Sequence, residues 1–225
     1  MIAAAFAALS DILRPEFRAV LWKSIGLTIA LLVVVWLALE SFLVWLVDTG
    51  SWPWLATAIA ILTGIGLLIG LGLLVAPVTA LFAGLFTDEI AGLVERRHYP
   101  QDPPGRDLPL GQSLLGTLAF TLVVIGVNLV CLILLLVPGV NLVAFLIGNG
   151  YLLGREYFEA AAVRFRPREE ARALRGRHGP TIFLAGLVIG LFVAIPIVNL
   201  AAPLFATAFM VHLHKRLTGS LPAAS

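Results

Sequence analysis

The sequence predicts an all-α integral membrane protein with two long transmembrane helices and two helical hairpins, at least one of them re-entrant. Three observations predict this fold class: the composition, two apolar stretches long enough to cross a bilayer, and a repeated turn motif. Of the 225 residues, 60% are hydrophobic and 12% are charged, and the mean hydropathy is +1.01. Soluble domains usually carry about 25% charged residues, so lipid is the expected solvent for this chain.

Two apolar stretches near the amino terminus are predicted to form a transmembrane hairpin, residues 25–86. The first covers residues 25–47 and is interrupted only by Glu40, and the second covers residues 54–86 without any charge. At about 1.5 Å per residue, each is long enough to cross a hydrocarbon core of about 30 Å. The short link between them is flanked by tryptophans, which is typical of a membrane interface.

Two later apolar regions share a turn motif that predicts a pair of related hairpins. Both contain Pro-x-Val-Asn-Leu, at residues 138–142 and 196–200, and such an internal echo indicates structural repetition. In the second hairpin, residues 180–214, the arms of about 15 residues span only about 22 Å, which is typical of a re-entrant segment. In the first, residues 112–153, the arm before the turn is long enough to cross and the arm after it is not, so its depth stays open.

The whole chain, residues 1–225, is expected to form one membrane domain, because no stretch is long and polar enough for a separate soluble unit. Four segments flank or connect the hairpins: an amphipathic amino-terminal segment (1–24), a cytoplasmic loop (87–111), a basic cytoplasmic segment (154–179) and a tail (215–225). The start lacks a basic region before its apolar residues and is therefore not expected to be a cleaved signal peptide. A single cysteine, Cys131, excludes an internal disulfide.

The basic residues predict the topology. All 15 lysines and arginines fall within the four segments that flank or connect the hairpins. The positive-inside rule therefore places these segments and both termini on the cytoplasmic face, with all three hairpins returning to it. Seven arginines in residues 154–179 fit either binding of an anion such as a nucleic acid or a helix attracted to anionic lipid. We favour membrane lipids as the partner and expect no nucleic acid, since the topology alone requires basic residues there.

No pattern in the sequence indicates an enzyme or a bound cofactor. A Ser-His-acid set, a phosphate loop and a zinc signature are all missing from it. The histidines His98, His178, His212 and His214 lie at predicted boundaries or loops and match no metal-ligand spacing. We therefore expect the histidines at the surface, and predict no catalytic residues, no metal and no cofactor.

Two asparagines after turn prolines are the first candidates for binding an anion. Asn141 and Asn199 each precede an apolar arm, where each would cap a half-helix whose amide groups and positive dipole end face the membrane interior. Several transporters hold charged substrates at broken helices of this kind. The alternative is that both asparagines only close their turns.

The start of the first long helix is the second candidate. Pro15 fits the first helical position and Arg18 follows one turn later, so helix-start amides and a guanidinium would face one anion. The alternative is that Glu16 pairs with Arg18 and leaves no site. Glu40, the one ionisable residue well inside the first span, either serves ion coupling or extends its side chain to the outer interface.

Three short motifs, in a fixed order along the chain, resemble those of a known family. They are Phe86-Thr87-Asp88-Glu89-Ile90 with Val94-Glu95, Gly150-Tyr151-Leu152-Leu153-Gly154-Arg155-Glu156-Tyr157-Phe158, and Pro196-Ile197-Val198-Asn199-Leu200 with Pro203. The chain thereby resembles the CysZ sulfate permeases and the related etoposide-induced membrane proteins over nearly its whole length. The resemblance implies a multi-pass protein of the bacterial inner membrane that admits sulfate for cysteine synthesis as a homo-oligomer.

The resemblance also implies a location for the anion. The sulfate-associated stretch of that family resembles Pro-Gly-Leu-Arg at the start of the first long helix, and this chain has Pro15-Glu16-Phe17-Arg18 there. Pro15, Phe17 and Arg18 are thus implied as anion-binding residues, with an acid in place of the glycine. Sulfate or a similar oxyanion is the expected substrate. The alternative is a non-transporting, membrane-organising or scaffold protein of the same fold.

Overall fold

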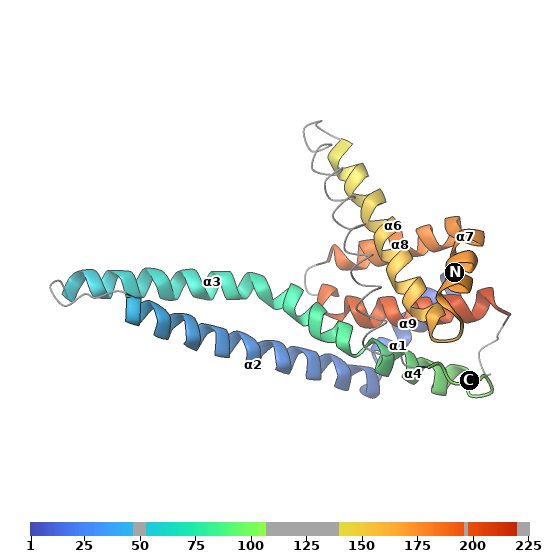
Figure 1. Ribbon diagram of the computed structural model, residues 1–225, viewed down its shortest axis with the longest axis horizontal. Helices are drawn as coiled ribbons and strands as arrows, with labels where there is room; N and C mark the ends of the chain where they lie inside the picture. The colour runs from blue at the N-terminus through green and yellow to red at the C-terminus, as the bar shows by residue number, and fades with distance from the viewer. Residues whose placement is uncertain (47–52, 107–139, 196–197, 220–225) are drawn as a thin grey trace.

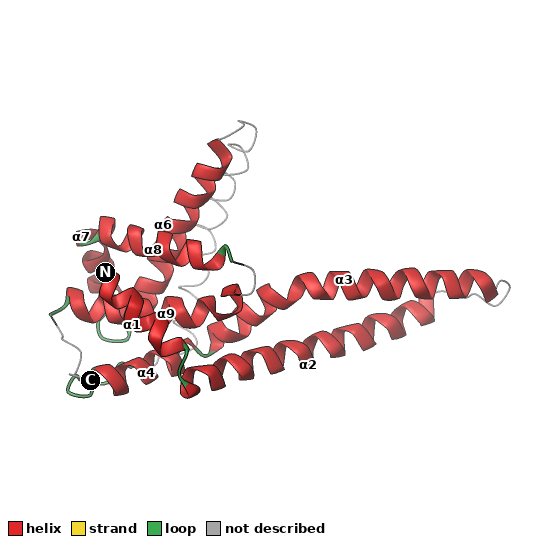
Figure 2. Cartoon of the chain, turned by 180° about the vertical axis from the view of Figure 1, so that it is seen from behind, coloured by secondary structure: helices red, strands yellow, loops and turns green. Residues whose placement is uncertain are grey.

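The computed structural model describes residues 1–46, 53–106, 140–195 and 198–219, and they form helices joined by short turns (Figure 1). The helices are α1 (Ile2–Ile12), α2 (Pro15–Leu46), α3 (Pro53–Leu85), α4 (Thr87–His98), α6 (Val140–Val163), α7 (Arg168–Arg177), α8 (Gly179–Val193), the 3-10 helix η1 (Val198–Ala201) and α9 (Ala202–Leu217). The described residues contain no strand, so the all-α prediction is confirmed for them. A long α2–α3 hairpin projects from a body that contains α1, α4, α7 and α9 (Figures 1 and 2).

The α2–α3 hairpin consists of two long helices. α2 contains 32 residues and α3 contains 33, the latter without a charge. A hydrogen bond from the Thr79 hydroxyl to Thr28 Oγ1, 3.1 Å long, joins the two helices near the body. Within the described residues, the stretch Pro15–Phe42 is long and apolar enough to cross a membrane. Exposed apolar side chains such as Val34 and Leu37 line it, as expected for a surface that faces lipid.

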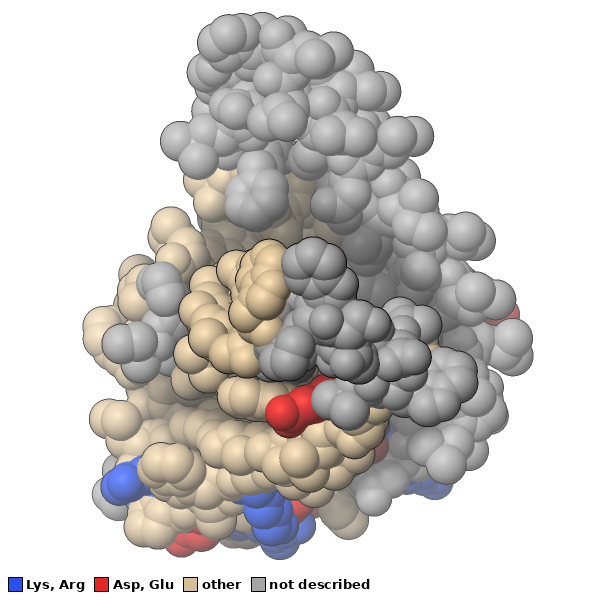
Figure 3. Space-filling view, turned by 90° about the vertical axis from the view of Figure 1, so that its left-hand side faces the viewer, with Lys and Arg blue, Asp and Glu red and all other residues tan. Residues whose placement is uncertain are grey.

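The charge distribution separates this hairpin from the body. No lysine or arginine occurs between Lys23 and Arg96. Seen from the far end of the hairpin, the lysine and arginine surface gathers toward the bottom of the molecule (Figure 3). The predicted topology, with the basic body on the cytoplasmic side, agrees with this separation and stays a prediction.

The second hairpin has the predicted arm lengths. α8 has 15 residues and α9 has 16, and η1 lies between them. α7 meets α8 at a bend of 91°. That this hairpin enters the membrane stays a prediction, and the arm of the first hairpin before its turn lies outside the described residues. The arm after the turn does not end at the expected boundary of residue 153, because α6 continues unbroken to Val163.

Glycines allow α6 and α8 to cross at backbone contact. A Cβ atom on Gly186 would overlap the carbonyl oxygen of Gly150 and the backbone of Gly154. Small residues of this kind let helix backbones approach closely. At Gly190, on the same helix as Gly186, a Cβ would meet the Leu153 side chain at an ordinary 3.9 Å.

α9 forms the centre of the body. Every residue from Ala202 to Lys215 is buried, and α1, α4, α6 and α8 contact it. α1 lies against it through Ala4 and Ala8, both fully buried. The opposite face of α1 is apolar as well, since Phe6 is 68% exposed. An apolar helix face turned away from the protein core is typical of a helix at a membrane surface.

We expect Gly186→Ala to destabilise the protein and Gly190→Ala, one turn later on the same helix, to be tolerated. The first change forces two backbones apart, and overpacking of this kind costs about 1–3 kcal/mol or more. The second adds a methyl group in ordinary contact, and alanine is favoured over glycine in a helix by about 1 kcal/mol. Thermal unfolding of both variants in detergent measures the difference. Equal melting temperatures would contradict the backbone contact.

Candidate functional site

The predicted anion site at the start of α2 is open to its surroundings. Pro15 begins the helix, and the backbone N–H of Arg18 donates to the Arg14 carbonyl at 2.9 Å. Because Pro15 has no N–H, the free helix-start amides are those of Glu16 and Phe17. The Arg18 side chain is exposed, whereas the Phe17 side chain is 2% exposed and packs in the core. Phe17 can therefore offer an anion its backbone amide and not its ring.

Glu16 does not neutralise Arg18 in the described part of the structure. Both side chains are exposed, and no ion pair between described residues joins them. The described residues therefore do not show the Glu16–Arg18 ion pair that the alternative requires. An exposed guanidinium one turn from a helix start remains as the anion candidate.

The other candidate residues lie away from Arg18 or outside the description. Glu40 is exposed on α2, 22 residues beyond Arg18 or about 33 Å by helix rise. Asn141 lies in the first turn of α6, and its side chain is outside the described residues. The structure thus separates the possible ion-coupling residue Glu40 from the predicted anion site.

Asn199 does not cap α9, which leaves the alternative that it only closes its turn. It lies in η1, half-buried, and its N–H donates to the Ile195 carbonyl at 2.8 Å. The residue before α9 is Ala201, which makes no side-chain capping bond. Pro203, near the first position of the helix, sets where α9 begins. The turn motif gave no sign of the 3-10 helix that contains Asn199 and precedes α9.

A cavity of about 250 Å³ opens among α6, α7 and α8. Arg155, Arg175, Tyr151 and Phe183 are among its lining residues, and none of the predicted anion-binding residues lines it. Both arginines face the Glu159 carboxylate, with Nε to Oε1 distances of 3.7 and 2.9 Å. Arginines of the predicted basic segment thus line a cavity that is separate from the start of α2.

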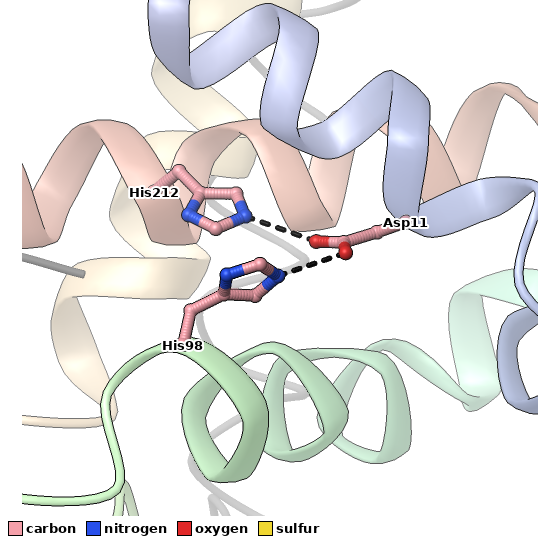
Figure 4. A group of neighbouring side chains, drawn as sticks. All are labelled: Asp11, His98 and His212. Atoms are coloured by element: carbon pink, nitrogen blue, oxygen red, sulfur yellow. Dashed lines mark hydrogen bonds and ion pairs between the residues drawn. The ribbon is translucent and has the colours of Figure 1, made fainter. Parts of the chain in front are cut away.

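A buried polar cluster joins three distant parts of the chain. Asp11 in α1 is completely buried. One carboxylate oxygen lies 2.8 Å from Nε2 of His98, at the end of α4. The other lies 3.0 Å from Nε2 of His212, in α9 (Figure 4). The Tyr99 hydroxyl lies 3.0 Å from Nδ1 of His212. Arg14 Nε, 3.4 Å from Asp11, completes the cluster.

The expectation of surface histidines is wrong for two of the four. His212 is 1% exposed and His214 is 2% exposed, because α9 runs through the body. The cluster was missed because Asp11 and His212 are separated by 201 residues, so no local spacing relates them. One signal was available: α1 is short and apolar and carries an acid, Asp11, near its end. If such a helix packs in the protein core, its carboxylate needs a hydrogen-bonding partner there.

The protonation of the cluster follows from its surroundings. Burial acts to raise the pKa of Asp11, but the hydrogen bonds from His212 and His98 and the charge on these rings outweigh it, so this pKa is lowered. Asp11 is therefore ionised at neutral pH. Burial raises the pKa of Tyr99 to about 12, and its hydroxyl keeps its proton.

A second buried network contains the acids of the Phe86–Glu95 motif. The Arg164 side chain, just after α6, is 4% exposed and donates from Nε to Glu95 Oε1 at 2.9 Å and from a second nitrogen to Asp88. The N–H of Gly105 donates to the other Glu95 oxygen at 2.9 Å. This motif therefore holds α4 to the end of α6 and to the chain that follows α4.

Comparison with known families identifies the chain. The family described as sulfate transporter CysZ/etoposide-induced protein 2.4 matches residues 4–203. The chain belongs to this family. No individual curated protein matches it significantly. In this member of the CysZ/etoposide-induced family, the match extends from α1 to the start of α9 and includes both the start of α2 and the network around Arg164.

In this CysZ-family protein we expect Arg164→Met to unfold at much milder conditions than the wild type. Removing one partner leaves Glu95 buried without a counter-charge, which commonly costs about 3–5 kcal/mol. The matched control is Lys23→Met, because Lys23 and Glu89 form an exposed pair at 3.0 Å that is worth at most about 1 kcal/mol. Unfolding in detergent compares the two. A loss for Arg164→Met no larger than for Lys23→Met would contradict the structural role of the motif.

Proposed function

We propose that this protein carries sulfate or a similar oxyanion across the bacterial inner membrane, as a multi-pass homo-oligomer without a catalytic residue or cofactor. The family match over residues 4–203 is the observation that carries the proposal. The long apolar helix Pro15–Phe42 supports the membrane location. Arg18 at its start supports the anionic substrate.

Contact with membrane lipids would explain why so many large apolar side chains are exposed. Large apolar residues on α1, on early α2 and in the turn between them are strongly exposed, among them Ile2 (69%), Leu13 (71%) and Trp22 (63%). Large apolar side chains exposed in such number point to a site of interaction. Membrane lipids are the partners that would cover these side chains, as they would cover the predicted transmembrane hairpin.

The start of α2 has the chemistry for a tetrahedral oxyanion. Two helix-start amides point along the helix dipole, and this end of a helix favours negative charge. The Arg18 guanidinium adds up to five donors in a planar fork that fits oxyanions. Glu16 contributes an opposing charge beside the amides, which should weaken the site without closing it.

Sulfate uptake into proteoliposomes tests the function, and Arg18→Ala tests the site. Loss of a charge-assisted hydrogen bond costs about 1.5–3 kcal/mol, so we expect the apparent sulfate affinity to fall by roughly ten- to more than a hundredfold. Arg18→Lys should recover part of it because the charge stays and the fork is lost. Glu16→Gly should raise the affinity. The matched control is Arg172→Ala, which removes another exposed arginine, on α7, and should leave uptake unchanged.

The outcomes distinguish failure of the transport proposal from failure of the proposed anion site. Uptake by wild-type vesicles no faster than by protein-free vesicles would contradict transport and favour the membrane-organising alternative. Normal uptake with unchanged affinity in both Arg18→Ala and Glu16→Gly would keep the function and reject the start of α2 as the anion site.

A further inference from the structure

We propose that Asp11, His98 and His212 form a binding site for a divalent transition-metal ion, with zinc as the best fit. The three residues come from α1, the end of α4 and α9 and turn toward one another in Figure 4. One ligand atom from each lies within 4.8 Å of the other two. The proposal is independent of sulfate transport, because none of these residues belongs to the proposed anion site.

The donor set selects the type of ion. Two imidazole nitrogens and one carboxylate oxygen suit zinc, copper or nickel and do not suit calcium or magnesium, which prefer oxygen ligands. Three protein ligands of this kind around zinc leave a fourth position for water or another ligand. The His98 side chain is 19% exposed, so an ion has an approach from outside while Asp11 and His212 stay buried.

The distances allow the three side chains to close around one ion. Ligands about 2.0–2.1 Å from a tetrahedral zinc ion lie about 3.3 Å from one another. The two nitrogen–oxygen contacts, which go to different oxygens of Asp11, are 2.8 and 3.0 Å long. The three ligand atoms lie within 4.8 Å of one another, so side-chain rotations have to bring any wider pair to the distance that zinc needs. The His98 and His212 rings meet edge to face, with centroids 4.8 Å apart, which leaves their Nε2 atoms aimed at the same carboxylate.

Tyr99 equips His212 to act as a ligand. A ligating histidine presents one nitrogen to the metal and donates the N–H of the other to a nearby acceptor. The Tyr99 hydroxyl, 3.0 Å from Nδ1 of His212, accepts that hydrogen bond when Nε2 binds the ion. Without an ion, the same hydroxyl donates to Nδ1 while Nε2–H donates to Asp11. The cluster is therefore satisfied in both states without rearrangement of the helices.

Charge also favours the ion. The Asp11 carboxyl group has no exposed surface, and the guanidinium beside it belongs to Arg14, a partly exposed side chain 3.4 Å away. A divalent cation supplies a stronger and better placed counter-charge than this contact. Its binding would hold α1 to α4 and α9 and so stabilise the body of the protein.

The test uses full-length protein purified in detergent through a tag without histidines and treated with a chelator. Isothermal titration calorimetry with zinc chloride should show one tight site per chain. Cobalt should give the visible absorption bands of a tetrahedral complex. We expect His98→Ala and His212→Ala to lose this site. Tyr99→Phe should weaken it by about ten- to a hundredfold, as other losses of such supporting hydrogen bonds do. His178→Ala, a histidine outside the cluster, is the matched control and should bind like the wild type.

A stability measurement guards against misfolded variants. Zinc should raise the melting temperature of the wild type and of His178→Ala, while His98→Ala, whose side chain is the most accessible of the three, should fold and show no shift. Equal zinc affinity in the wild type and His98→Ala would overturn the proposal, as would loss of binding in His178→Ala.

Discussion

The burial of the Asp11 carboxylate is the constraint on which the arrangement of the body depends. An ionised carboxylate taken out of water costs several kcal/mol unless partners meet it. Its partners are His98 and His212, so the first helix of the chain must lie against both the end of α4 and α9. Ala4 and Ala8, on the same face of α1 as Asp11, have side chains small enough for close packing there.

The position of α1 in turn fixes where the long hairpin begins. α1 ends at Ile12, and α2 starts only three residues later at Pro15. The start of α2 and its Arg18 are therefore held beside the body. Lys23, on the next turns of α2, reaches Glu89 of α4 at 3.0 Å. In the proposed function, the oxyanion would meet the protein at this junction between the body and the apolar hairpin.

Features encoded within a short stretch of sequence were the ones that sequence analysis could predict. The α2–α3 hairpin follows from two long apolar runs, the start of α2 follows from Pro15, and the short arms α8 and α9 follow from the proline turn between them. Each depends on the properties of neighbouring residues alone. For Asn199, sequence analysis left a helix cap and a turn residue as alternatives, and the 3-10 helix η1 moves the start of α9 beyond it.

Contacts between distant segments could not be predicted in this way. Asp11, His98 and His212 are polar residues on separate helices, and only the folded chain brings them together. The same holds for Arg164, whose acidic partners lie 69 and 76 residues away. Composition predicted that charges would lie outside the membrane, and it carried no information on which charges would be buried against each other.

A double-mutant cycle between Asp11 and His212 tests the central claim that their contact holds the two ends of the chain together. Asp11→Ala, His212→Ala and the double variant would be unfolded in detergent without metal and compared with the wild type. A buried contact to a charged group predicts a coupling free energy of about 1.5–3 kcal/mol. A coupling of zero within error, with each single variant adding independently, would contradict the account.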